Sequence, residues 1–60
     1  MTQAAQVAAA LFRQYGEDAV VIATLRAAEV AALGDVEALA HWDEVAAILS
    51  GEHDTGQIAN

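Results

Sequence analysis

Residues 18–35 read DAVVIATLRAAEVAALGD, and this stretch decides the fold. On a helix, apolar side chains would cover well over half of its circumference, and Asp18, Arg26 and Glu29 would form a narrow polar strip. No proline interrupts it, and its commonest residue, alanine, has the highest helix propensity. A helix that is apolar nearly all round is usually buried on several sides. We therefore predict a helix that packs against more than one neighbour.

The residues on either side of this stretch predict two more helices. Gly34 suits the left-handed position after a helix, and Asp35 suits the N-cap of the next one. Upstream, Thr2 suits an N-cap and Gly16 a helix end. Apolar residues recur with the helical period on both sides, and no alternating run indicates a strand. The sequence therefore predicts an all-α protein of three short amphipathic helices joined by tight glycine turns, at about 3–15, 18–33 and 36–49.

The three predicted helices form a single domain over residues 1–51. The polar residues 52–60 are expected to be a flexible, disordered tail. The large side chains on the apolar stripes are expected to form the core, with Trp42 as its largest contributor. The predicted core residues are Leu11, Phe12, Tyr15, Leu25, Leu39, Trp42, Val45 and Leu49.

The charge of the chain argues against several classes of partner. The net charge is −7, and the two basic side chains are Arg13 and Arg26. Phosphate contacts need a basic patch, so we expect no direct binding to nucleic acid and none to an anionic membrane surface. No apolar run approaches the about 20 residues that cross a bilayer, and the first residues lack a cationic signal-peptide region. A cytoplasmic protein is therefore expected, which the absence of cysteine suits.

The residues that carry chemistry do not form a recognisable catalytic set. His41 has Glu37 and Glu44 at helical spacing, which favours an ion pair on the surface. A metal or catalytic site needs three convergent ligands, or a nucleophile beside a base. We therefore expect no enzymatic activity, no cofactor and no metal, with zinc at His41 or His53 as a weaker alternative. A deep ligand pocket is not expected in so small a bundle.

The apolar circumference of the second helix predicts self-association. A domain of this size buries only about 60% of the surface of its unfolded chain, and without cysteine it has no disulfide to compensate. A homodimer is favoured because two-fold dimers are the commonest closed oligomers. Arg26 either covers apolar surface with its stem or pairs with a carboxylate of the partner. The residues expected at this interface are Val20, Val21, Arg26, Ala27, Val30 and Ala31. The alternative is a monomer in which the second helix is simply the central element.

Two functions from different classes stay open. The first is a small non-enzymatic interaction or regulatory protein, which self-associates or docks another protein through its apolar second helix or its acidic third helix. The second is an acidic mimic of nucleic acid that inhibits a DNA- or RNA-binding enzyme, since Glu37 and Glu44 lie one heptad apart on one face. A helix-turn-helix regulator is disfavoured, because Asp43 and Glu44 stand where a reading helix needs basic residues.

A family resemblance covers most of residues 12–49. Its motifs are Tyr15-Gly16-Glu17-Asp18, Arg26, Leu33-Gly34-Asp35, Ala38-Leu39-Ala40-His41-Trp42 and Val45-Ala46. In these motifs the chain resembles short uncharacterised α-proteobacterial helical proteins with a domain of unknown function. The family more often has arginine at the position of His41, so the chain departs from it there. The resemblance implies a stand-alone bacterial helical domain and no particular chemistry.

Overall fold

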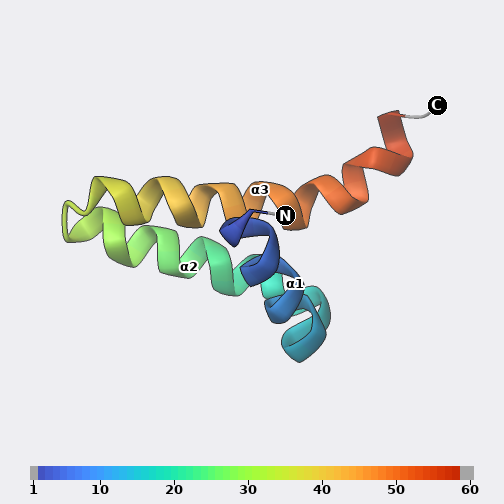
Figure 1. Cartoon of the computed structure of the whole chain (residues 1–60), viewed down its shortest axis with the longest axis horizontal. Helices are drawn as coiled ribbons and strands as arrows, with labels where there is room; N and C mark the ends of the chain where they lie inside the picture. Colours follow the sequence, from blue (N-terminus) through green and yellow to red (C-terminus); the bar gives the residue numbers. More distant parts are fainter. Residues whose placement is uncertain (1, 59–60) are drawn as a thin grey trace.

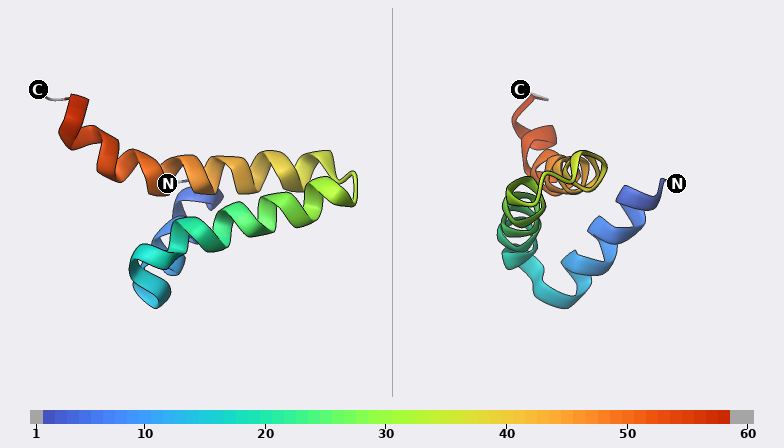
Figure 2. Two further views of the ribbon diagram at one scale, coloured as in Figure 1. Left: turned by 180° about the vertical axis from the view of Figure 1, so that it is seen from behind. Right: turned by 90° about the vertical axis from the view of Figure 1, so that its left-hand side faces the viewer.

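The computed structural model describes the backbone of residues 2–58 and the side chains of residues 2–51. Its elements are α1 (Gln3–Tyr15), the 3₁₀ turn η1 (Gly16–Asp18), α2 (Ala19–Ala32) and α3 (Val36–Ile58). The prediction of an all-α protein is confirmed. Helices α2 and α3 lie side by side and antiparallel, and α1 crosses one end of this pair (Figures 1 and 2).

Side-chain and glycine caps define the ends of α1. The Thr2 hydroxyl accepts a hydrogen bond from the Ala5 N–H at 3.1 Å. At the other end, Gly16 has φ +60° and its N–H donates to the Phe12 carbonyl. Both ends agree with the predicted range. The chain then makes the η1 turn, so the second helix begins at Ala19, one residue later than predicted.

The turn between α2 and α3 is closed by two backbone hydrogen bonds. The Gly34 N–H donates to the Ala31 carbonyl and the Asp35 N–H to the Val30 carbonyl, both at 3.0 Å. This is the Schellman arrangement, which requires the positive φ of +76° at Gly34. The Asp35 carboxylate also accepts from the Ala38 N–H at 3.1 Å and so caps α3. Because the turn is so short, α3 must fold straight back along α2.

The third helix is longer than the sequence predicts. We expected Ser50 and Gly51 to end it, but the backbone stays helical to Ile58. Glycine ends a helix by adopting a positive φ, and in the described chain only Gly16 and Gly34 do so. We also expected residues 52–60 to be disordered. The side chains of these residues, and the backbone of residues 59–60, lie outside the described part of the structure.

The core between the helices consists mainly of alanine. Its buried residues are Ala4, Ala8, Ala19, Ala23, Ala27, Val45 and Leu49. Alanine allows close approach of helices but removes little apolar surface from water per residue. Val45 is the largest side chain that is fully buried in the described structure. The core is therefore thin, and much of the larger apolar surface stays outside it.

Three predicted core residues lie at the surface. Val45 and Leu49 are buried, and Leu11, Leu39 and Trp42 are half-buried, whereas Phe12, Tyr15 and Leu25 are exposed. The prediction is wrong for these last three. Each step of four residues along a helix rotates the side-chain direction by about 40°. Phe12 therefore lies about 80° round the helix from the buried Ala4. Tyr15 is the last residue of α1, and Leu25 lies opposite the buried side of α2.

Candidate functional site

Helix α2 has one side in the core and one side in solvent. The core side carries Ala19, Ala23 and Ala27, spaced four residues apart. No other described helix lies along the far side of α2, which forms one edge of the fold (Figure 2). The far side of α2 is therefore open to a partner.

This far side is an uninterrupted apolar row. At about 100° per residue, its members fall within an arc of about 60° that is centred opposite the core side. They are Val21, Leu25, Ala28 and Ala32, which we call the outer seam. All four are exposed, with Val21 at 53% and Leu25 at 58% of their full exposure. The outer seam thus presents its largest side chains directly to water.

The spacing within the outer seam is that of paired helices. Intervals of four, three and four residues match the heptad repeat by which two helices pack knobs into holes. At about 1.5 Å per residue, the seam is about 17 Å long. Large contiguous apolar patches are the surfaces at which proteins commonly interact, so we take the outer seam as the candidate site.

An exposed ion pair lies beside the outer seam. The Arg26 guanidinium and the Glu29 carboxylate are 3.1 Å apart, and their side chains are 58% and 62% exposed. Along the opposite edge, the Thr24 hydroxyl donates to the Val20 carbonyl at 2.8 Å. An exposed pair contributes about 0–1 kcal/mol, so Arg26 can exchange its partner at little cost. The seam is therefore uncharged itself. Glu29 lies on one edge, about 70° from its centre, whereas Arg26 lies about 130° from that centre.

The predicted interface residues are divided between the two sides of α2. Val21, Arg26 and Ala31 are exposed, and Val20 and Val30 are half-buried. Ala27 is only 8% exposed, so its prediction as an interface residue is wrong: it follows Ala23 by four residues on the core side. Leu25, Ala28 and Ala32 are not among the residues predicted for the interface. The signal that identifies them is their heptad spacing along the helix. A count of the apolar residues around the helix does not reveal this spacing.

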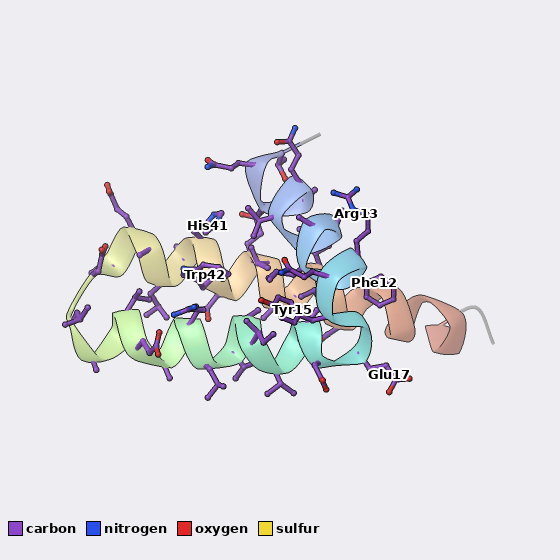
Figure 3. The ribbon with its side chains drawn as sticks, turned by 90° about the horizontal axis from the view of Figure 1, so that it is seen from below. Phe12, Arg13, Tyr15, Glu17, His41 and Trp42 are labelled. Atoms are coloured by element: carbon purple, nitrogen blue, oxygen red, sulfur yellow. The ribbon has the colours of Figure 1, made fainter. Side chains whose placement is uncertain are left out.

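A second apolar feature is an open groove between α1 and α3. Its volume is about 370 Å³, at the lower end of the range for ligand sites, but the groove is open to solvent. Its lining comprises Ala5, Ala8, Ala9, Phe12, Arg13, Ile48 and Leu49. Phe12 and Arg13 project from the last turns of α1 (Figure 3). Arg13 is the one ionisable group in this lining, so the groove offers no pair of groups for general acid–base chemistry.

His41 does not form the ion pair that its spacing favours. In the described structure, it makes no salt bridge or hydrogen bond with Glu37 or Glu44. Its ring instead contacts Trp42 edge to face, with the ring centres 5.4 Å apart (Figure 3). No group of three or more potential ligands for a metal occurs among the described residues. The side chain of His53 lies outside this part of the chain.

The exposed acidic residues are spread over the molecule. Within the described side chains, they are Glu17, Asp18, Glu29, Asp35, Glu37, Asp43 and Glu44. Glu37 and Glu44 share a face of α3, but Asp43 lies about 100° round the helix from Glu44. The acids on η1, on α2 and in the turn belong to other surfaces. This arrangement is typical of a solvated surface.

The described helices include none that is both long enough and apolar enough to span a membrane. Comparison of the chain with family models, with curated proteins and with solved structures finds no match. The resemblance to α-proteobacterial helical proteins therefore stays a prediction, and the outer seam is the feature from which a function is best argued.

Proposed function

We propose that this chain is a small, non-enzymatic helical interaction protein that self-associates through the outer seam of α2. The observation that carries the proposal is a heptad-spaced apolar row in which Val21 and Leu25 are more than half exposed. Burial of apolar surface contributes about 25 cal/mol per Å², and no described residue of the same chain supplies that burial. A second copy, or a helix of another protein, would supply it.

The thin core supports the same proposal. Most of the buried residues are alanines, so packing within one chain yields little hydrophobic stabilisation. Small domains commonly obtain the missing stabilisation by oligomerisation. The chain has no cysteine, which suits a reducing cytoplasm. We propose that compartment for it.

Sedimentation equilibrium over micromolar to millimolar concentrations tests self-association. We expect the average mass of the wild type to rise toward that of a dimer, and Leu25→Lys to stay at the monomer mass because a charge then lies in the seam. Leu33→Lys is the matched control. Leu33 is 82% exposed but lies about 110° from the centre of the seam, and the substitution changes the net charge equally. A wild type that is monomeric throughout, or a Leu25→Lys chain that associates normally, would contradict the proposal.

The acidic-mimic alternative has less support. It rests on Glu37 and Glu44, which share one exposed face of α3. A surface that imitates a phosphate backbone needs negative charges repeated along a continuous line. The remaining described acids lie on other surfaces, so the interaction protein is the function that we propose.

A further inference from the structure

We infer that the second copy docks antiparallel on α2, about a two-fold axis that passes between Leu25 and Ala28. This inference rests on the proposed function and adds the orientation and the register. The observation behind it is the order of side-chain sizes along the outer seam. The two large residues, Val21 and Leu25, occupy its first half, and the two small ones, Ala28 and Ala32, occupy its second half.

An antiparallel pair in this register matches large side chains to small ones. Leu25 then faces the partner's Ala28, and Val21 faces the partner's Ala32. Every level of the interface thus holds one large and one small side chain, so the two helix axes keep a constant separation. The same row of side chains is therefore complementary to itself when it is reversed.

A parallel pair does not have this complementarity. Leu25 would meet the partner's Leu25, while Ala28 would meet the partner's Ala28. The helices would be held apart at one end, and a gap would remain at the other. Protein interiors are close-packed, and a gap beside alanine forfeits contacts without gaining any. The sizes of the side chains therefore favour the antiparallel orientation.

The size of the seam sets the affinity that we expect. A standard stable interface buries about 1,200–2,000 Å² in total, and a 17 Å row with two alanines falls below that. The net charge of −7 on each copy adds repulsion. We therefore expect a dissociation constant in the micromolar range or weaker, and the orientation must be measured at high protein concentration.

Distances between nitroxide spin labels test the orientation. The chain has no cysteine, so Glu17→Cys and Leu33→Cys each create a unique labelling site. Both positions are exposed and flank the seam at opposite ends. In the antiparallel pair, residue 17 lies about 28 Å along the axis from residue 17 of the partner, but about 5 Å from residue 33 of the partner. The labels themselves add several ångströms to each distance.

The expected result is a short distance in a mixture of the two labelled chains and long distances when each labelled chain is measured alone. A parallel pair would give short distances when each labelled chain is measured alone and a long distance in the mixture. That result would contradict the antiparallel inference but agree with the proposed function. If the labelled chains give no dipolar signal and the unlabelled wild type is monomeric at the same concentrations, both the antiparallel inference and the proposed function are wrong. The same labels on a Leu25→Lys chain are the control, and their signal should disappear.

Discussion

At the scale of single residues, the turn between α2 and α3 depends on two neighbours with different properties. Gly34 supplies a positive φ of +76°, which a residue with a Cβ atom adopts only with strain. Asp35 supplies a carboxylate that accepts from the Ala38 N–H. Its own N–H donates to the Val30 carbonyl. One residue therefore completes the end of α2 and the beginning of α3.

Gly34→Ala should lower the free energy of unfolding by about 1–2 kcal/mol, because alanine is strained at positive φ. A Cβ atom at this position would contact no other part of the protein within 4 Å, so the loss comes from the local backbone strain alone. Gly51→Ala is the matched control. Gly51 lies inside α3 without a positive φ, and there alanine should raise the stability by about 0.5–1 kcal/mol. Urea denaturation followed by circular dichroism, at one protein concentration, measures both; effects of the same sign would contradict this account.

At the scale of the elements, the ends of the first two helices could be predicted from the sequence, because caps are local chemistry. Thr2, Gly16, Gly34 and Asp35 act through hydrogen bonds to residues at most five positions away. The end of α3 could not be predicted in this way. Whether Gly51 ends a helix depends on its φ, and residue type alone leaves that angle free.

The buried side of α2 could not be predicted, because the helix has two apolar sides. One carries Ala19, Ala23 and Ala27, and the other is the outer seam with Leu25. The helical period tells which residues share a side but not which side faces α3. We attribute the outcome to close approach, which favours the alanine side and leaves Leu25 in solvent. For the same reason, Val21 is the one residue of the outer seam that could be predicted from the sequence.

Ala23→Leu should therefore destabilise the protein by about 1–3 kcal/mol, because Ala23 has 0% exposure and a larger side chain overpacks the core. Ala47→Leu is the control on α3. Ala47 is exposed, and the same substitution there should change stability by less than about 0.5 kcal/mol. Midpoints of chemical denaturation measure the difference. Equal midpoints for the two variants would show that the helices are not closely packed at Ala23.

At the scale of the whole molecule, small size and negative charge have opposite effects on self-association. The thin alanine core favours association with a second copy, whereas the net charge of −7 opposes it. Acids spread over several surfaces repel a second copy in any orientation. The balance between the two effects should therefore depend on ionic strength.

Raising the salt concentration should strengthen self-association. Between about 0.1 M and 1 M, the screening length falls from about 10 Å to about 3 Å, which weakens the repulsion between two copies. We expect the dissociation constant from sedimentation equilibrium to fall several-fold. Leu25→Lys should stay monomeric at both salt concentrations. A dissociation constant that rises with salt would show instead that contacts between opposite charges dominate the interface.

The shared residue Asp35 also restricts how the length of the chain can vary. Because α2 ends and α3 begins around one residue, the turn has no slack in which an insertion could be absorbed. One residue added between Asp35 and Val45 would rotate all later side chains of α3 by about 100° and carry the buried Val45 toward water. Related chains that keep this fold should therefore vary in composition along α3 while conserving the number of residues between the glycine turn and the buried valine.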